Sequence, residues 1–176
     1  VKVRTIRLLG IRPVMRVALY RAKQKINWYA LLKHTTLLPE DTYFFSQVEM
    51  DTTKALEPGQ PFEVSSPPNW HLNPKTNCHA DSTKPWWEIS DFDKALGDIK
   101  CVWEASRFDW VLHFAQAHLQ GNTHALKQLN TWLYDWQEKN PAYYGANWKC
   151  GQEAGIRILH LAMGAALLEQ VNASEM

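Results

Sequence analysis

The stretch H-A-L-K-Q-L-N-T-W-L-Y-D-W-Q-E-K, residues 124–139, decides the fold class of this chain. Its apolar side chains recur every three or four residues, which places them on one face of an α-helix. The preceding Gly121-Asn122-Thr123 is a stop-and-restart signal, because Gly ends helices and Asn or Thr caps them. Pro141 disfavours helical geometry at Asn140. The sequence therefore predicts a helix over residues 123–139, with apolar positions Leu126, Leu129, Trp132, Leu133 and Trp136.

Helical spacing continues on both sides of this segment. Asp91 or Asp98 can cap a helix that runs to about Leu119, and a third helix is predicted from about Asn147 to Gln170. Short connections between helices of this length favour antiparallel neighbours. Residues 91–176 are therefore predicted to be all-α, a set of helical hairpins. The flanking helices carry their apolar positions at Trp103, Trp110, Val111 and Phe114, and at Ala154, Ile158, Leu161, Ala165 and Leu168.

Residues 38–90 have a different composition. Proline recurs every few residues, so no helix of useful length fits there. An irregular stretch of this length is uncommon in a compact domain unless it wraps a surface or serves a site. The chain also has nine Trp, six Tyr and six Phe, more than one core of this size needs, and several of them fall in this segment. We expect residues 38–90 to form a long irregular, aromatic-rich segment that wraps the helical part.

Residues 1–37 form a basic N-terminal segment with helical spacing over residues 12–33. Residues 1–39 hold nine Lys or Arg and no acid, whereas the rest of the chain holds ten bases and eighteen acids. A basic amphipathic helix of this kind could contact an anionic membrane surface through residues 1–33, or a nucleic acid. It could equally be a solvated face beside an acidic partner. The chain has no further nucleic-acid motif, so no nucleic-acid partner is expected.

Several classes of site are not indicated. No apolar run approaches the roughly eighteen residues of a membrane-spanning helix. The three cysteines are widely spaced, and the histidines show no metal spacing with a third ligand, so no metal site is expected. The common nucleophile, phosphate-loop and zinc-protease motifs are absent, and no cofactor is expected.

Two polar and aromatic clusters are the candidate site. On a continuous helix, Lys100, Glu104 and Arg107 would share one face with Trp103. At the start of the third helix, unpaired backbone donors near Asn147 and Trp148 attract anions. Further along that helix, Glu153 and Arg157 are four residues apart. The structural alternative is that Glu104 with Arg107, and Glu153 with Arg157, are ordinary ion pairs within a helix, and that Trp132 and Trp136 are core residues.

These motifs resemble those of a known family. D-I-K-x-x-W-E-x-S-R-F, Asp98–Phe108, is similar to a helix opening in the N-terminal domain of heparinase II/III-type polysaccharide lyases. The basic start at Arg12, Pro13 and Arg16 and the Trp70-x-x-Asn73-Pro74 segment also resemble that family. So does a downstream string of fixed order and spacing, made of Trp136, Asn140, Pro141, Gly145, Asn147, Trp148, Glu153 and Arg157.

The resemblance implies an incomplete α/α toroid of helical hairpins around a substrate cleft, followed by a β-sandwich region. Such enzymes cleave uronate-containing polysaccharides by β-elimination, without a nucleotide cofactor, and a periplasmic or cell-envelope location is favoured. The family's catalytic residues lie downstream of the matched motifs, so no catalytic residue is transferred and this portion is expected to be inactive alone. Its partners would be an acidic polysaccharide and the remainder of the same polypeptide.

The resemblance also implies a set of cleft-wall residues that face the sugar or organise the cleft. Tryptophan faces stack on sugar rings, and arginine binds carboxylate or sulfate at two points. A second reading is a non-catalytic carbohydrate-binding or surface-polysaccharide assembly protein with the same toroid. The substrate-binding candidates are Trp103, Arg107, Asn147, Trp148, Glu153 and Arg157.

Overall fold

The computed structural model describes residues 10–26, 43–44 and 66–170. Of these residues, 58% are helical and the strands are short, so the predicted all-α class is confirmed. The chain divides into two compact units, residues 1–37 and 38–176. No helix among the described residues is long and apolar enough to cross a membrane.

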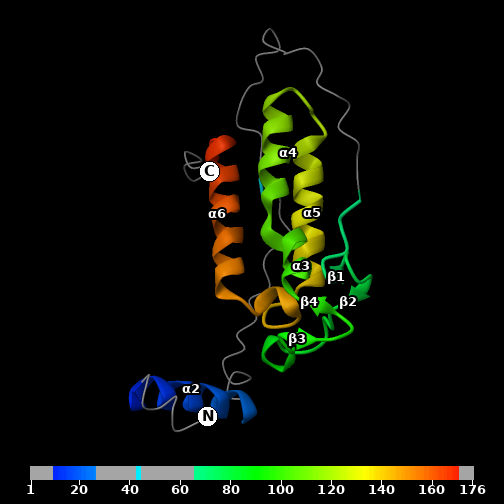
Figure 1. Cartoon of the computed structure of the whole chain (residues 1–176). Helices are drawn as coiled ribbons and strands as arrows, with labels where there is room; N and C mark the ends of the chain where they lie inside the picture. The colour runs from blue at the N-terminus through cyan, green and yellow to red at the C-terminus, as the bar shows by residue number, and fades with distance from the viewer. Residues whose placement is uncertain (1–9, 27–42, 45–65, 171–176) are drawn as a thin grey trace. The chain divides into compact units, whose positions relative to one another are not determined.

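The first unit contributes one described helix, α2, Ile11–Lys25 (Figure 1). Gly10 precedes it with a φ of 76°, a left-handed geometry that glycine adopts without strain. Pro13 lies in the first turn, where backbone N–H groups have no partner inside the helix. The sequence predicted helical structure over residues 12–33, and the part after Ile26 lies outside the described residues.

Three helices form a single row in the second unit: α4, Asp109–Leu119; α5, Ala125–Lys139; and α6, Gly151–Leu167. Helix α4 lies between α5 and α6, and α5 runs antiparallel to both (Figure 1). The closest approach of α4 and α6 is at Gly164, where an added Cβ would lie 2.6 Å from Val111 Cγ1. The hairpin prediction for this region is therefore sound in outline, although one row of helices does not define a toroid, which stays a prediction.

Aromatic side chains fill the core between these helices. Trp110 of α4 packs edge-on against Trp132 of α5, with 5.2 Å between ring centroids. Trp70, from the segment before the helices, is fully buried beside both. Trp132 and Trp136 were predicted to be core residues, and they are: Trp136 is buried and Trp132 packs against the cluster. The largest fully buried side chains of this core are those of Trp70, Phe114, Leu129, Leu168 and Val111.

The prediction of one helix from Asp91 or Asp98 to Leu119 was wrong. The strands β3, Phe92–Asp93, and β4, Gly97–Asp98, form a hairpin, followed by the short helix α3, Lys100–Trp103, and a 3₁₀ turn, η4, Glu104–Arg107. Phe108 then has a φ of 68° and separates this turn from α4. Its ring is buried against Trp110 and Trp136, at 5.1 and 4.9 Å between centroids. This packing outweighs helix propensity, because burying an aromatic ring stabilises the fold more than continuing a helix does.

Residues 66–90 contain short elements and no α-helix. The strands β1, Leu72–Asn73, and β2, Cys78–His79, form a two-stranded antiparallel pair, and η3, Trp86–Glu88, is a 3₁₀ turn. Upstream, the Asn130 side chain of α5 accepts hydrogen bonds from the backbone N–H groups of Tyr43 and Phe44 and donates one to the Phe44 carbonyl. Residues 45–65 lie outside the described residues, so the wrapping predicted for residues 38–90 stays a prediction.

Candidate functional site

The two sequence motifs meet in space through an ion pair between Arg107 and Glu153. Arg107 Nε donates to Glu153 Oε2 at 2.8 Å, and Nη2 donates to Oε1 at 3.0 Å, so the contact is bidentate. The hydrogen bonds to Glu153 raise the pKa of Arg107 above its usual value. Neither predicted intrahelical ion pair is found in the described chain, because Arg107 and Glu153 pair with each other across 46 residues. The break at Phe108 turns Arg107 toward α6, which sequence spacing alone could not indicate.

Arg157 is buried behind this ion pair. Its guanidinium carbon lies 5.2 Å from the centroid of the Trp136 ring and 5.6 Å from that of Trp148. Nη2 donates to the carbonyl of Asn147 at 2.9 Å. Desolvation lowers the pKa of Arg157, while the nearby Glu153 carboxylate opposes that shift. Arg157 therefore joins α6 to the loop before it, with two aromatic faces holding the cation in place.

Asn147 joins three segments of the chain. Its Nδ2 donates to the carbonyl of Trp70 at 2.9 Å and to Asn140 Oδ1 at 2.8 Å. Trp148 Nε1 donates to the carbonyl of Asn140 at 3.0 Å. On the other side, Trp103 Nε1 donates to the carbonyl of Ala146 at 2.9 Å. The six predicted site residues therefore lie together in one cluster, here called the motif cluster: Trp103, Arg107, Asn147, Trp148, Glu153 and Arg157.

Burial separates the two roles predicted for these residues. Asn147, Glu153 and Arg157 are 0%, 5% and 4% exposed, so they cannot touch a sugar in this conformation. Arg107 has a side chain that is 33% exposed, and Trp148 is half-buried. Trp103 is buried but borders a shallow hollow of about 690 Å³ beside the β3–β4 hairpin. The buried members can only organise a neighbouring surface, and direct contact is left to Arg107, Trp148 and the edge of Trp103.

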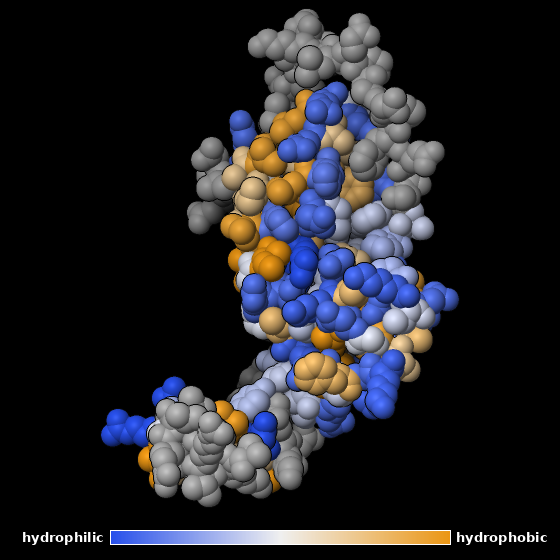
Figure 2. All heavy atoms as spheres, in the orientation of Figure 1, coloured by the Kyte–Doolittle hydropathy of each residue, from blue (hydrophilic) through white to orange (hydrophobic). Residues whose placement is uncertain are grey.

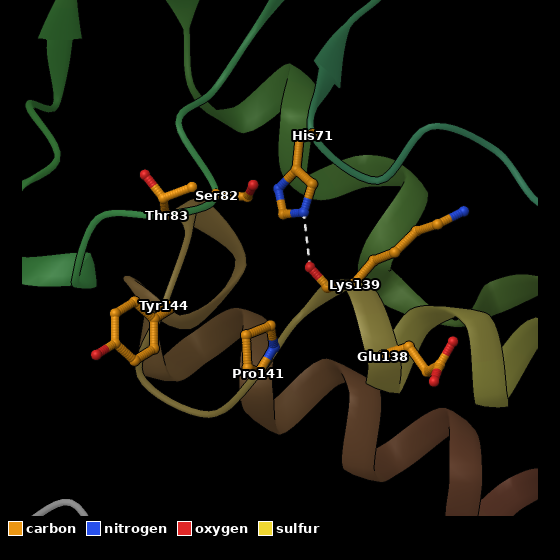
Figure 3. A pocket seen from close by; sticks show the side chains of 7 residues that line it. All are labelled: His71, Ser82, Thr83, Glu138, Lys139, Pro141 and Tyr144. Atoms are coloured by element: carbon orange, nitrogen blue, oxygen red, sulfur yellow. Dashed lines mark hydrogen bonds between the residues drawn. The ribbon is translucent and has the colours of Figure 1, made fainter.

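A pocket of about 520 Å³ adjoins the motif cluster (Figure 3). Its walls come from the start of β1, the loop before η3, the end of α5 and the loop that follows α5. Flat apolar faces of Pro141 and Tyr144 stand beside hydroxyl, imidazole, carboxylate and ammonium groups. We call it the Tyr144 pocket, and its lining residues are His71, Ser82, Thr83, Glu138, Lys139, Pro141 and Tyr144.

The motif cluster fixes two walls of the Tyr144 pocket. Asn147 holds Trp70 and Asn140, and each of these is the direct neighbour of lining residues. The third wall is the loop before η3, and two backbone hydrogen bonds join it to the loop that follows α5. Gly145 N–H donates to the Lys84 carbonyl at 2.9 Å, and Trp86 N–H donates to the Tyr143 carbonyl at 2.9 Å. Buried amide networks of this kind hold a surface in one geometry. Asn147 therefore holds two walls of the pocket in place, and its role in a substrate cleft stays a prediction.

Two residues of the same loop have a positive φ. Tyr143 has a φ of 72°, an uncommon value for a residue with a bulky side chain. Gly145 has a φ of 80°, and an added Cβ would lie 3.2 Å from His71 Cε1. Glycine is therefore required at position 145 both for its conformation and for the close approach of the imidazole. Strained backbone of this kind is common beside binding sites.

His71 is the titratable group at the back of the pocket. Its Nε2 lies 2.9 Å from the carbonyl of Lys139, drawn as the dashed line in Figure 3. Because a carbonyl only accepts, Nε2 carries the proton in this contact, and the neutral ring keeps its lone pair on Nδ1. Burial lowers the pKa of His71, which favours the neutral ring. Nδ1 is itself buried, so His71 shapes the wall and offers no exposed base.

The charged groups around the Tyr144 pocket are largely neutralised by neighbours. Lys139 Nζ lies 2.6 Å from Asp135 Oδ1, and Lys84 Nζ lies 3.1 Å from Asp81 Oδ2. Hydrogen bonds from Thr83, above all from its side chain, lower the pKa of Asp81 to about 2. The lining carboxylate of Glu138 accepts a hydrogen bond from the Tyr134 hydroxyl at 3.1 Å and makes no ion pair among the described residues, so the pocket is polar with one carboxylate that no lysine neutralises. Such a surface fits a ligand that offers hydroxyl groups and the apolar face of a ring, as a sugar does.

The described residues include no cluster of three or more His, Cys, Asp or Glu side chains that could hold a metal. Comparison with protein-family models, curated proteins and solved structures finds no significant match for this chain. The resemblance to heparinase II/III-type lyases therefore rests on the motif residues themselves.

Sequence reasoning missed most of the pocket lining. His71, Ser82 and Thr83 lie in the segment that was interpreted as an irregular wrap, and no spacing rule connects them to α5. Tyr144 follows the Asn140-Pro141 turn, but its place at the pocket depends on the bridge that its backbone makes with Pro85. The available signals were the nearness of His71 to the Trp70-x-x-Asn73-Pro74 motif and the presence of Pro141 in the downstream motif string.

Proposed function

We propose that this chain is the N-terminal portion of a heparinase II/III-like lyase, which cleaves uronate-containing polysaccharide by β-elimination, and that it supplies part of the cleft wall. The observation that carries the proposal is the motif cluster. Two motifs that resemble one family are about forty residues apart, yet their residues pair with each other, Arg107 with Glu153 and Trp103 with the loop at Ala146. Direct contact between the two motifs supports the proposal that both come from one family.

The Tyr144 pocket is the part of the wall that suits a sugar. Tyr144 and Pro141 offer flat apolar faces, and Ser82, Thr83 and Glu138 offer groups that hydrogen-bond hydroxyls. Because nearby lysines already pair with carboxylates, we expect contacts here to sugar hydroxyls and ring faces, with little dependence on salt.

The outer face of α6 supports an unfinished array of helices. Ile158, Leu159, Met163 and Leu167 are 67%, 57%, 44% and 38% exposed, and Figure 2 shows apolar atoms gathered over this helix. A helix that is apolar all round is typical of a buried position. A further helical hairpin from the remainder of the polypeptide would cover this stripe, as in an α/α toroid.

In the proposed reaction, a side chain neutralises the uronate carboxylate, a base removes the proton from C5, and an acid protonates the leaving glycosidic oxygen. None of these roles is assigned to residues of this chain. Its own residues hold the wall: Asn147 fixes the two sides of the pocket, and Arg157 fixes α6 against the loop. We therefore expect no elimination by this chain alone.

A second candidate is a non-catalytic carbohydrate-binding protein with the same helices. It is favoured by the charge of this region, because residues 40–176 carry eighteen acids and ten bases, which weakens the binding of a polyanion and suits a ligand of lower charge density. The ion pair of Arg107 also leaves that guanidinium less available to a uronate.

Titration with acidic oligosaccharides, followed by tryptophan fluorescence, tests the proposal. We expect binding by the chain and a loss of about tenfold in affinity for Tyr144→Ala, since an aromatic contact contributes up to about 1.5 kcal/mol and about 1.4 kcal/mol corresponds to tenfold. Leu119→Ala is the control, because this side chain is 46% exposed at the end of α4 and lines neither the Tyr144 pocket nor the hollow beside Trp103.

A longer polypeptide that contains this chain distinguishes the two candidates. The lyase proposal predicts an unsaturated uronate product, seen by its ultraviolet absorbance, when that polypeptide is mixed with acidic polysaccharide. Binding without product supports the second candidate. Equal titration of the Tyr144 variant and the wild type contradicts the pocket assignment.

A further inference from the structure

Helix α2 carries an apolar face with basic side chains on both of its edges. Ile11, Met15, Ala18 and Ala22 follow the spacing of a single helix face, and Val14 and Leu19 flank it. Arg12 and Arg16 are four residues apart, about one helical turn, and lie along one edge of this face. Arg21 lies along the other edge. Val17 and Tyr20 lie on the opposite side, so the division between the faces is not complete.

The large apolar side chains of this face are more than half exposed. Ile11, Met15 and Leu19 are 64%, 56% and 54% exposed. The three arginines are exposed as well, and the helix has no acidic residue along its whole length. An exposed apolar patch without an internal partner marks an interaction surface.

Two properties decide what kind of surface α2 fits. Its positive charge without any acid requires an anionic partner, and its apolar face requires one with a hydrocarbon interior. Nucleic acids and acidic polysaccharides satisfy the first condition only. A bilayer with anionic headgroups satisfies both, because the apolar face enters the boundary between headgroups and acyl chains while the bases contact phosphate.

We propose that α2 binds the surface of an anionic phospholipid membrane and lies parallel to it. The helix of fifteen residues is about 22 Å long, which is shorter than the hydrocarbon thickness of a bilayer, and its arginines suit the headgroup layer. The proposal is independent of the proposed lyase function, because it involves only the first unit of the chain. Binding weakens as salt is raised, since the electrostatic part is screened.

Sedimentation of the full chain with vesicles tests the proposal. One set of vesicles contains equal parts of phosphatidylcholine and phosphatidylserine, and the other contains phosphatidylcholine alone. The chain pellets with the anionic vesicles and far less with the neutral ones. The triple variant Arg12→Glu, Arg16→Glu, Arg21→Glu loses about a hundredfold in affinity, since each basic residue near an anionic surface is worth about fivefold.

A matched control carries the same change of charge at exposed lysines of the second unit: Lys75→Glu, Lys94→Glu and Lys127→Glu. It binds the anionic vesicles like the wild type, apart from a small long-range effect. A second variant, Ile11→Gln with Met15→Gln, keeps the charge and removes apolar area, and it loses about tenfold or more. Because all these changes are at exposed positions, near-ultraviolet circular dichroism of each variant should match that of the wild type.

Three results overturn the proposal. The first is equal pelleting of the arginine variant and the lysine control. The second is unchanged binding by the glutamine variant, which means that charge alone acts. The third is binding to soluble heparin that depends on the three arginines without any binding to anionic vesicles, which assigns the helix to polyanions in solution.

Discussion

Helices α2 and α6 both expose apolar side chains, yet their surroundings differ. The face of α2 is bordered by arginines, and the helix has no acid. The exposed stripe of α6 contains Gly155, Ile158, Leu159, Ala162, Met163, Ala166 and Leu167, and no Lys, Arg, Asp or Glu occurs between Arg157 and Glu169. An apolar face with charged borders suits the boundary between water and a charged layer, whereas an apolar face without charges suits the interior of a protein.

The inner face of α6 explains why its outer face is uncharged. Glu153 and Arg157, near the start of α6, are turned inward and are both used in the motif cluster. Gly164 lets α6 approach α4 closely. The charges of this helix therefore fix it in place, and its remaining surface is left for packing. In α2 the three arginines, Arg12, Arg16 and Arg21, are exposed at the surface and can contact a partner.

The largest expected effect tests how firmly the inner face of α6 is anchored. Arg107→Ala leaves the buried Glu153 carboxylate without its bidentate partner, which we expect to lower the free energy of unfolding by about 2–4 kcal/mol. The estimate is below the full cost of breaking a buried ion pair, because the Arg107 side chain is one-third exposed. Chemical denaturation measures it.

Glu104→Ala is the control, because Glu104 is an exposed charge in the same turn. It should change the free energy of unfolding by less than about 0.5 kcal/mol. If the two variants are equally stable, the ion pair does not anchor α6, and the contrast between its two faces is weaker than we describe.

An intermediate effect is expected on the outer face of α6. Because Leu159 and Met163 are exposed on an apolar stripe, we expect the chain to self-associate through this face at high concentration. Leu159→Lys with Met163→Lys should weaken that self-association by about tenfold or more, because the charges oppose burial of the stripe. Sedimentation velocity at several protein concentrations measures this. High salt should preserve or strengthen association through α6, since that contact is apolar, but weaken vesicle binding through α2.

The same pair of lysines should leave binding to anionic vesicles intact, and the arginine variant of α2 should leave self-association intact. Loss of vesicle binding in the α6 variant, or self-association that falls as salt is raised, would show that the two faces do not have separate roles.

The smallest expected effect is the contribution of His71 to the dependence of stability on pH, which sets the pH range in which the two faces should be compared. Burial lowers the pKa of His71 in the folded chain, so at mildly acidic pH the unfolded chain binds the proton more readily. The contribution of His71 to stability is therefore complete above pH 6.5, its unfolded value, and is lost as the pH falls through the lower folded value. Thermal melts at several pH values should show this slope.

His71→Gln should flatten that slope, because glutamine does not titrate and can still donate to the Lys139 carbonyl. His113→Gln is a control at an exposed histidine of α4. Equal slopes for both variants and the wild type would assign the pH dependence to other groups.

The helix at residues 123–139 was predictable because its pattern is strong and its ends are marked by Gly121 and by Pro141; α5 runs from Ala125 to Lys139. The third helix was also predicted in outline, and α6 begins a few residues later than expected, at Gly151. The break at Phe108 could not be predicted, because it depends on two tryptophans that lie 2 and 28 residues further along the chain.

The candidate site was only half predictable. Arg107, Glu153, Asn147 and Arg157 were selected from their motifs, and they do lie together, but the pairing expected within helices is replaced by pairing between segments. The Tyr144 pocket was not predicted, since its walls come from four places in the chain. The toroid, the lyase activity and the acidic polysaccharide stay predictions for the experiments above.

The sequence alone determined the helical class, the basic and acid-free start, and which residues carry hydrogen-bonding and aromatic side chains, because these depend on composition and on spacing along one element. Tertiary structure decided which charges pair, which faces are buried and where a pocket opens. These depend on contacts between segments far apart in the chain, and there the burial of aromatic rings and of paired charges outweighs local preference.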